Sequence, residues 1–170
     1  MNKSHIAKNG LNAGLRTGVL LVALSLAGTA AYAAVSPFRV LAGSWSGGGT
    51  ISMSDGQQEP LRCRASYDVD ESGAQLHLNL RCASASYNFD LASDVEYRGG
   101  AVSGQWTEAS RNASGTLEGR AAGDHIEVAA NGQSFSANLS MTTHGNRQTV
   151  SIRPEGGGDI RAVSLALARR

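Results

Sequence analysis

Two cysteines carry the most definite chemistry in this sequence, because together they can form a disulfide. Cys63 and Cys82 stand 19 positions apart, on two alternating segments joined by the loop 71–74. If Asp70 faces Gln75 across that loop, the same antiparallel register places Cys63 directly opposite Cys82. The sequence therefore predicts a cross-strand disulfide, with two free thiols as the alternative.

The side chains of these two segments support that register, because they sort by face. The face of the cysteines also carries Ala65, Tyr67, Val69, Leu76, Leu78 and Leu80. The opposite face carries Arg64, Ser66, Asp68, Asp70, Gln75, His77, Asn79 and Arg81. Side chains alternate along a strand, and a one-residue slip would move the whole apolar set to the wrong side.

The sequence shows no catalytic or metal-binding constellation. His77 lies on a polar strand face, His125 follows a turn and His144 lies in one, so none has metal-ligand spacing with another. The serine-rich stretches lack a Gly-x-Ser-x-Gly elbow, and no Lys-Ser/Thr follows the glycines 47–49. We expect no enzyme activity, no metal and no cofactor, and we interpret 47–49 as strand coiling at a barrel corner or close approach by another backbone.

Two groups of polar residues are candidate binding sites. Glu108, Arg111 and Asn112 follow Trp106 closely, and a carboxylate, a guanidinium and an amide near a barrel mouth can bind a polar group of a ligand. An intraloop salt bridge with a turn-forming Asn explains the same residues.

The second group consists of Arg62, Arg64 and Arg81 on the polar face of the disulfide hairpin. The predicted register sets Arg64 beside Arg81, which is unfavourable unless an acid or a ligand lies between them. These arginines form either a solvated face or a patch that binds an anionic partner.

Residues 1–33 have the pattern of a cleavable secretory signal. Lys3, Lys8 and Arg16 precede an apolar run from residue 18 to 28, and Ala31-Tyr32-Ala33 matches a small-x-small cleavage site. A membrane anchor is the alternative, but the run has about 11 residues and a spanning helix needs about 20. We therefore expect a periplasmic or secreted domain of residues 34–170 without stable membrane insertion.

The charge of the expected mature chain excludes one class of partner. Without the three basic residues of the leader, 12 of the 15 basic residues remain against 14 acidic ones, a net charge of −2. No basic field is left to attract nucleic acid.

Short alternating segments with turn residues between them predict the fold. The turns are expected at Asp55-Gly56, Gly99-Gly100, Asn131-Gly132, residues 144–146 and residues 156–158, with Val128 facing Phe135 and Ile126 facing Ala137. Segments 85–91 and 115–121 are weaker strands, and a short helical turn begins at Ser36-Pro37 and ends at Gly43. We predict an all-β fold: an antiparallel up-and-down meander of about 8–10 strands that closes into a small barrel, with a sandwich as the alternative.

The segment Leu41-Ala42-Gly43-Ser44-Trp45, a short turn followed by Gly-x-Trp at the first strand, resembles the calycin superfamily of lipocalins, avidins and small bacterial protease inhibitors. This resemblance implies that Trp45 closes one barrel end and that Arg169, at the end of the last strand, stacks on it. No motif of the inhibitors matches residues 34–39. The chain is also similar to exported proteins of rhizobium-like bacteria, a likeness that implies no function.

These observations support two functions of different classes. The first is a non-enzymatic barrel that binds an unknown small ligand inside or at its mouth, as barrels of about eight strands do. The alternative is a protein-binding module, such as an inhibitor of a periplasmic or secreted enzyme.

Overall fold

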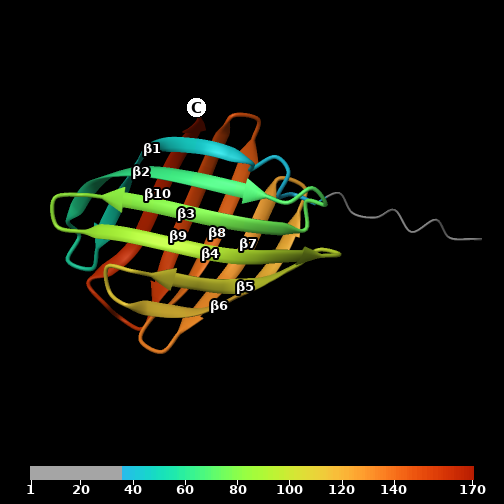
Figure 1. The fold of residues 1–170 in the computed structure, drawn as a ribbon. Coiled ribbons are helices and arrows are strands. Elements are labelled where there is room, and N and C mark those ends of the chain that lie inside the picture. Colours follow the sequence, from blue (N-terminus) through green and yellow to red (C-terminus); the bar gives the residue numbers. More distant parts are fainter. Residues whose placement is uncertain (1–35) are drawn as a thin grey trace, which may run out of the picture. The chain divides into compact units, whose positions relative to one another are not determined.

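The computed structural model describes residues 36–170, so the predicted signal peptide lies outside the described residues. The described part contains ten strands, which follow one another through short loops: Gly43–Met53 (β1), Gln58–Val69 (β2), Gln75–Ala83 (β3), Asn88–Arg98 (β4), Ala101–Glu108 (β5), Ala113–Ala122 (β6), His125–Gly132 (β7), Ser136–His144 (β8), Arg147–Glu155 (β9) and Ile160–Arg169 (β10). Each strand pairs antiparallel with its neighbours, and β1 also pairs with β10, which closes the barrel (Figure 1). The predicted all-β meander and its closure are confirmed.

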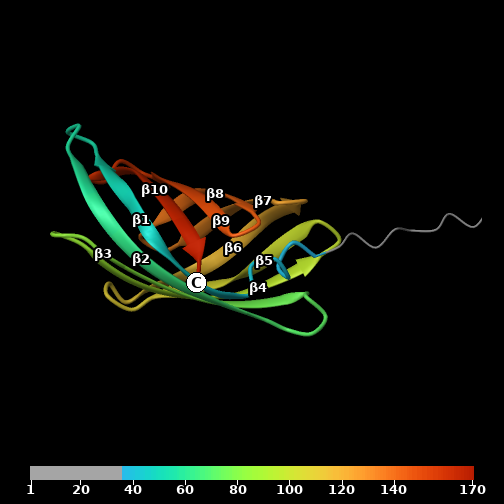
Figure 2. The same cartoon turned by 90° about the horizontal axis from the view of Figure 1, so that it is seen from above.

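Two strands form the corners at which the barrel folds over. Figure 1 shows β2–β5 crossing in front of β7–β10, with β1 and β6 at the two borders of the front layer, and Figure 2 shows the two layers from above. A Cβ built on Gly49 of β1 would lie 1.9 Å from the carbonyl oxygen of Ser164, and one on Gly119 of β6 would lie 2.0 Å from that of Glu127. Glycine is therefore required because the neighbouring backbone comes too close for any side chain.

The disulfide hairpin has the predicted register. Cys63 pairs with Cys82, their Cα atoms are 4.1 Å apart, and the two sulfur atoms are bonded. Arg64 stands directly opposite Arg81 on the other face of the same hairpin. The apolar residues of this hairpin face the barrel interior, as their alternation requires.

The hairpin at Gly99-Gly100 is also confirmed, with Tyr97 opposite Val102. The separate strand predicted for residues 85–91 is wrong, because β4 runs without a break from Asn88 to Arg98 and residues 84–87 form a turn. Ser93 interrupts the apolar alternation of β4 but does not interrupt the strand. It is 3% exposed, and its hydroxyl donates to the carbonyl oxygen of Gln105 at 2.9 Å.

The hairpin predicted at Asn131-Gly132 forms two residues later. Val128 pairs with Leu139 and not with Phe135, and Ile126 pairs with Met141 and not with Ala137. The shift is an even number of residues, so every side chain keeps its predicted face.

The reason for that shift is a packing requirement at Gly132, which stays within β7. A Cβ at this position would lie 2.9 Å from Cζ2 of the Trp106 indole and 2.8 Å from the carbonyl oxygen of Ser114. The glycine therefore makes room for the indole ring and does not serve the turn.

One end of the barrel is closed by the segment before β1. The predicted helical turn is a single turn, in which the Leu41 amide donates to the Phe38 carbonyl at 2.8 Å. Residues 36–170 contain no helix that is long and apolar enough to cross a membrane. Phe38 and Leu41 are each 1% exposed, and the ring of Phe38 packs edge-on against Tyr97 with 6.0 Å between centroids.

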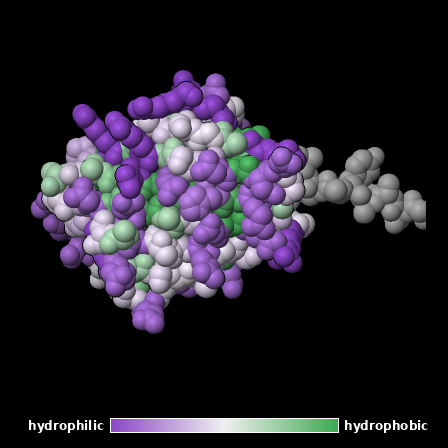
Figure 3. Space-filling view, in the orientation of Figure 1, coloured by the Kyte–Doolittle hydropathy of each residue, from purple (hydrophilic) through white to green (hydrophobic). Residues whose placement is uncertain are grey.

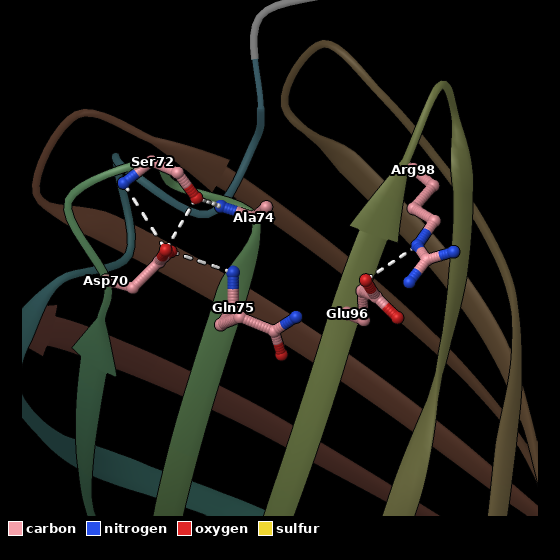
Figure 4. A network of polar contacts seen from close by, with 6 residues as sticks. All are labelled: Asp70, Ser72, Ala74, Gln75, Glu96 and Arg98. Atoms are coloured by element: carbon pink, nitrogen blue, oxygen red, sulfur yellow. Dashed lines mark hydrogen bonds and ion pairs between the residues drawn. The ribbon is translucent and has the colours of Figure 1, made fainter.

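The loop between β2 and β3 holds this segment in place. Asp70 accepts hydrogen bonds from the Ser72 hydroxyl and the Gln75 amide, at 2.5 and 2.8 Å (Figure 4). These bonds hold the pKa of Asp70 below its usual value, and the bond from the Ser72 hydroxyl has the largest effect. Arg39 donates to the Glu71 carbonyl at 2.5 Å, which ties the segment to the ordered loop.

The corner glycines give a direct test of closure. We expect Gly119→Ala to lower the free energy of unfolding by at least about 2 kcal/mol, because the added methyl group forces β6 away from β7. Urea unfolding followed by far-UV circular dichroism measures the change. The control is Gly158→Ala, where the added Cβ meets nothing within 4 Å, and equal stabilities of the two variants would contradict the role of the corner.

Candidate functional site

The closed end is built around Trp45, which is 1% exposed. Its indole Nε1 donates to the Leu41 carbonyl at 2.7 Å, and the guanidinium carbon of Arg169 lies 4.6 Å from the ring centroid. Arg169 also donates to the carbonyl oxygens of Ala42 and Val40. The guanidinium thus joins the end of β10 to the ring and to the segment before β1, and this end of the barrel is sealed.

A buried polar chain lies just inside this end. The Tyr67 hydroxyl donates to Oε1 of Gln148 at 2.7 Å, and Nε2 of Gln148 donates to the Thr143 hydroxyl at 3.3 Å. Burial raises the pKa of Tyr67 to about 12, although the bond to Gln148 acts in the opposite direction. Gln148 was missed from the sequence, but its signal is visible: it lies in phase with the inward-facing Val150 and Ile152 of β9.

Beyond this chain, several inward-facing apolar side chains are only partly buried. The strand registers place a set of apolar side chains on the inward face, next to the core, and yet each retains partial exposure. This set consists of Leu78, Leu80, Val128, Leu139, Met141, Val150 and Ile152. The inward face of the barrel thus keeps some apolar surface accessible.

Trp106 is the unusual residue of this interior. Its side chain is buried, with 5% exposure, and it packs edge-on against Phe135 with 5.9 Å between ring centroids. Among residues 36–170, its Nε1 is the one buried side-chain nitrogen or oxygen without a hydrogen-bond partner. Buried donors are almost always paired, so this indole N–H is an exception among the described residues.

The predicted cluster of Glu108, Arg111 and Asn112 comes together at the turn between β5 and β6. The carboxylate of Glu108 accepts hydrogen bonds from the amides of Asp90, Ser110 and Arg111, at 2.9, 3.2 and 2.8 Å. Asn112 has φ of 50°, the left-handed conformation that Asn tolerates in a turn.

Arg111 completes this turn. It lies 3.6 Å from the Glu108 carboxylate, donates to the Asn88 carbonyl at 3.1 Å and covers the ring of Phe89 at 4.7 Å from its centroid. Glu108 and Arg111 are thus engaged within the turn and its neighbours, as the intraloop interpretation expects.

Burial alone would raise the pKa of Glu108. The hydrogen bonds from the Asp90 amide, from the hydroxyl and amide of Ser110 and from the Arg111 amide outweigh it, so the pKa lies below the ordinary value of a glutamate.

The three predicted arginines Arg62, Arg64 and Arg81 line one groove on the outer face of β1–β4, together with Arg170. Arg170 was missed because it follows the last strand and shows its position only once β10 pairs with β1.

Each of the three histidines in residues 36–170 pairs with one carboxylate, at 2.7 Å for His77 and Asp94, 3.1 Å for His125 and Glu127, and 2.7 Å for His144 and Asp124. Within residues 36–170, no three side chains of the metal-binding types gather around one point.

Comparison with known proteins shows the fold and nothing finer. No protein-family model matches the sequence, and no curated protein matches it significantly. The structure is similar to the crystal structure of Rv2717c from M. tuberculosis, with a TM-score of 0.62, 14% identity, and coverage of 77% of this chain and 93% of that one. It is also similar to the S-type phycobiliprotein lyase CPES from Guillardia theta, with a TM-score of 0.57, 10% identity, and coverage of 78% and 90%.

The low pKa of Glu108 has a measurable consequence for stability. A carboxylate whose folded pKa lies below its unfolded value of about 4.3 stabilises the protein above that pH, and the contribution is lost as the pH falls through the folded pKa. We expect Glu108→Gln to be less stable than the wild type at pH 7, with a difference that shrinks in acid. Urea unfolding across this pH range measures it, and Glu118→Gln on the exposed face of β6 controls for the lost charge. A difference that does not change with pH would contradict the assignment.

Proposed function

We propose that this protein is an exported, non-enzymatic, calycin-like barrel that binds a small neutral molecule in its interior. The ligand has an apolar body and one hydrogen-bond acceptor. The observation that carries the proposal is the unpaired N–H of Trp106, in a barrel whose inward-facing wall is apolar and incompletely buried. The disulfide supports export, because such bonds persist in oxidising compartments.

The two tryptophans of the chain show why the unpaired group matters. The indole N–H of Trp45 is also buried, but it donates to a backbone carbonyl at 2.7 Å. A buried donor without a partner costs about 1–3 kcal/mol, and a bound acceptor would recover that free energy. The carbonyl or ether oxygen of a ligand is an acceptor of this kind.

The surroundings of Trp106 support an entrance from the end opposite Trp45. Phe135 lies in the loop between β7 and β8, contacts the indole ring and is 40% exposed, although large apolar side chains are usually covered. The ring therefore lies where a ligand that enters at this end would meet it.

The similarly folded phycobiliprotein lyase is compatible with this proposal, but its name also allows a catalytic role for a barrel of this kind. The absence of enzyme activity in the present chain stays a prediction. The alternative of a protein-binding module has no specific support from the interior, since a protein partner would leave the Trp106 N–H unpaired.

Acetophenone and ethylbenzene form a matched pair of probes, because they have similar shapes and only acetophenone carries an acceptor. We expect acetophenone to shift the indole N–H resonance of Trp106 downfield in an amide-proton NMR spectrum, while ethylbenzene shifts it less. The Trp45 resonance serves as the internal reference, because its N–H is already paired. We expect Trp106→Phe to bind the two probes with equal affinity.

Two results would contradict the proposal. One is that neither probe changes the Trp106 resonance at millimolar concentration. The other is that both probes perturb Trp45 and Trp106 alike, which would indicate nonspecific partitioning into the protein.

A further inference from the structure

The outer face of β1–β4 carries a groove that the interior site does not use. Its volume is about 940 Å³, and four arginines line it: Arg62 and Arg64 of β2, Arg81 of β3 and Arg170 after β10. Figure 3 shows hydrophilic side chains projecting over β1–β3 on this face. Small residues of the outward row, such as Gly48 of β1, lie between the arginines and leave the groove open.

The groove carries more positive than negative side chains. Four of the 12 arginines in residues 36–170 line it, with Asp90 as the only carboxylate side chain among the lining residues. A second outer groove, across β6–β9, is lined by Arg120 and Arg153 together with Glu118 and Glu127, so its charges balance. Residues 36–170 hold 14 acidic and 12 basic side chains, so a groove with four arginines and one carboxylate is a local excess of positive charge.

The arrangement of the arginines is unfavourable without a partner. Arg64 is directly opposite Arg81, and like charges at this position destabilise a pair of strands. Arg81 lies 3.3 Å from the carboxylate of Asp90, but within the described residues Arg62 and Arg64 form no ion pair. The neighbouring Cys63–Cys82 disulfide holds β2 and β3 together at this point and so maintains the repulsive pair.

We propose that this groove binds an anionic oligosaccharide that carries sulfate or phosphate groups. A guanidinium offers two parallel donors to such a group, which makes arginine better suited than lysine to bind it. Ser46, Asn88 and Ser110 add hydroxyl and amide groups for sugar hydroxyls, and Asp90 can accept from one. The volume lies at the upper end of the range for small-molecule sites, which suits a ligand of more than one sugar ring.

Two other polyanions fit the groove less well. Single-stranded nucleic acid is held by exposed aromatic rings on which bases stack, but Phe89, the one aromatic residue that lines the groove, has its ring covered by Arg111. A membrane surface would require exposed apolar side chains beside the charges. In residues 36–170 the exposed large apolar residues are Val40 and Phe135, and neither lines the groove.

The test uses a heparin-derived hexasaccharide and its desulfated counterpart, titrated into the intact protein by calorimetry at about 0.05 M and 0.15 M salt. We expect the sulfated chain alone to bind, more weakly at the higher salt. We expect the double change Arg64→Gln and Arg81→Gln to weaken binding at least about tenfold. The corresponding lysine variant retains charge without the planar fork, so we expect an intermediate affinity.

A stability measurement distinguishes a variant that has lost the binding site from one that has failed to fold. Removing two opposed positive charges relieves repulsion, so the glutamine double variant should be at least as stable as the wild type while it binds less. The matched control is Arg120→Gln with Arg153→Gln in the charge-balanced groove, which should leave binding unchanged.

Three results would overturn the proposal: no binding of the hexasaccharide by the wild type, equal weakening by the control variant, or equally tight binding of a single-stranded oligonucleotide or of vesicles that contain phosphatidylglycerol. The interior proposal is independent of all three, because its probes are neutral and its readout is the Trp106 resonance.

Discussion

The close approach of backbone to backbone at the two corner strands is the constraint on which the rest of this structure depends. At Gly49 and Gly119, the carbonyl of the neighbouring strand occupies the space of a side chain. Without these approaches β1 would not reach β10, and two sheet edges would stay exposed. Closure also determines which residues meet, because it places Arg169 over Trp45 and Arg170 beside the arginines of β2.

Much of the fold can be predicted from the sequence, because strand alternation and turn chemistry are local properties. The register of the disulfide hairpin follows from the apolar face between Cys63 and Cys82, and Gly99-Gly100 turns where a two-residue loop requires it. The failures have one physical cause in common. Gly132 is typical of a turn, but it stands within β7 because the Trp106 ring occupies the space of a side chain there. Ser93 is polar, but it is buried within β4 because its hydroxyl bonds to the carbonyl of Gln105 on β5.

The candidate sites are less predictable than the fold, for the same reason. The sequence brings Arg62, Arg64 and Arg81 together because they belong to one hairpin, but it cannot add Arg170 without the pairing of β1 with β10. It also cannot tell which tryptophan has a partner for its N–H. Trp45 finds one four residues earlier in its own chain, whereas Trp106 depends on neighbours from other strands and finds none among the described residues.

The two proposed sites differ in the charge that they accept, and the buried phenol of Tyr67 explains why. Burial raises the pKa of Tyr67 to about 12, although its hydroxyl bonds to Oε1 of Gln148 at 2.7 Å. The interior around Tyr67 therefore disfavours a negative charge. A ligand that carries sulfate or phosphate would meet the same penalty inside the barrel, whereas on the outer face water and four guanidinium groups surround it. Because β2 places alternate residues on opposite faces, Tyr67 faces the apolar interior and Arg64 faces water, although they are only three residues apart. We therefore expect the single-layer wall of the barrel to separate the proposed interior site for neutral molecules from the proposed outer site for anions.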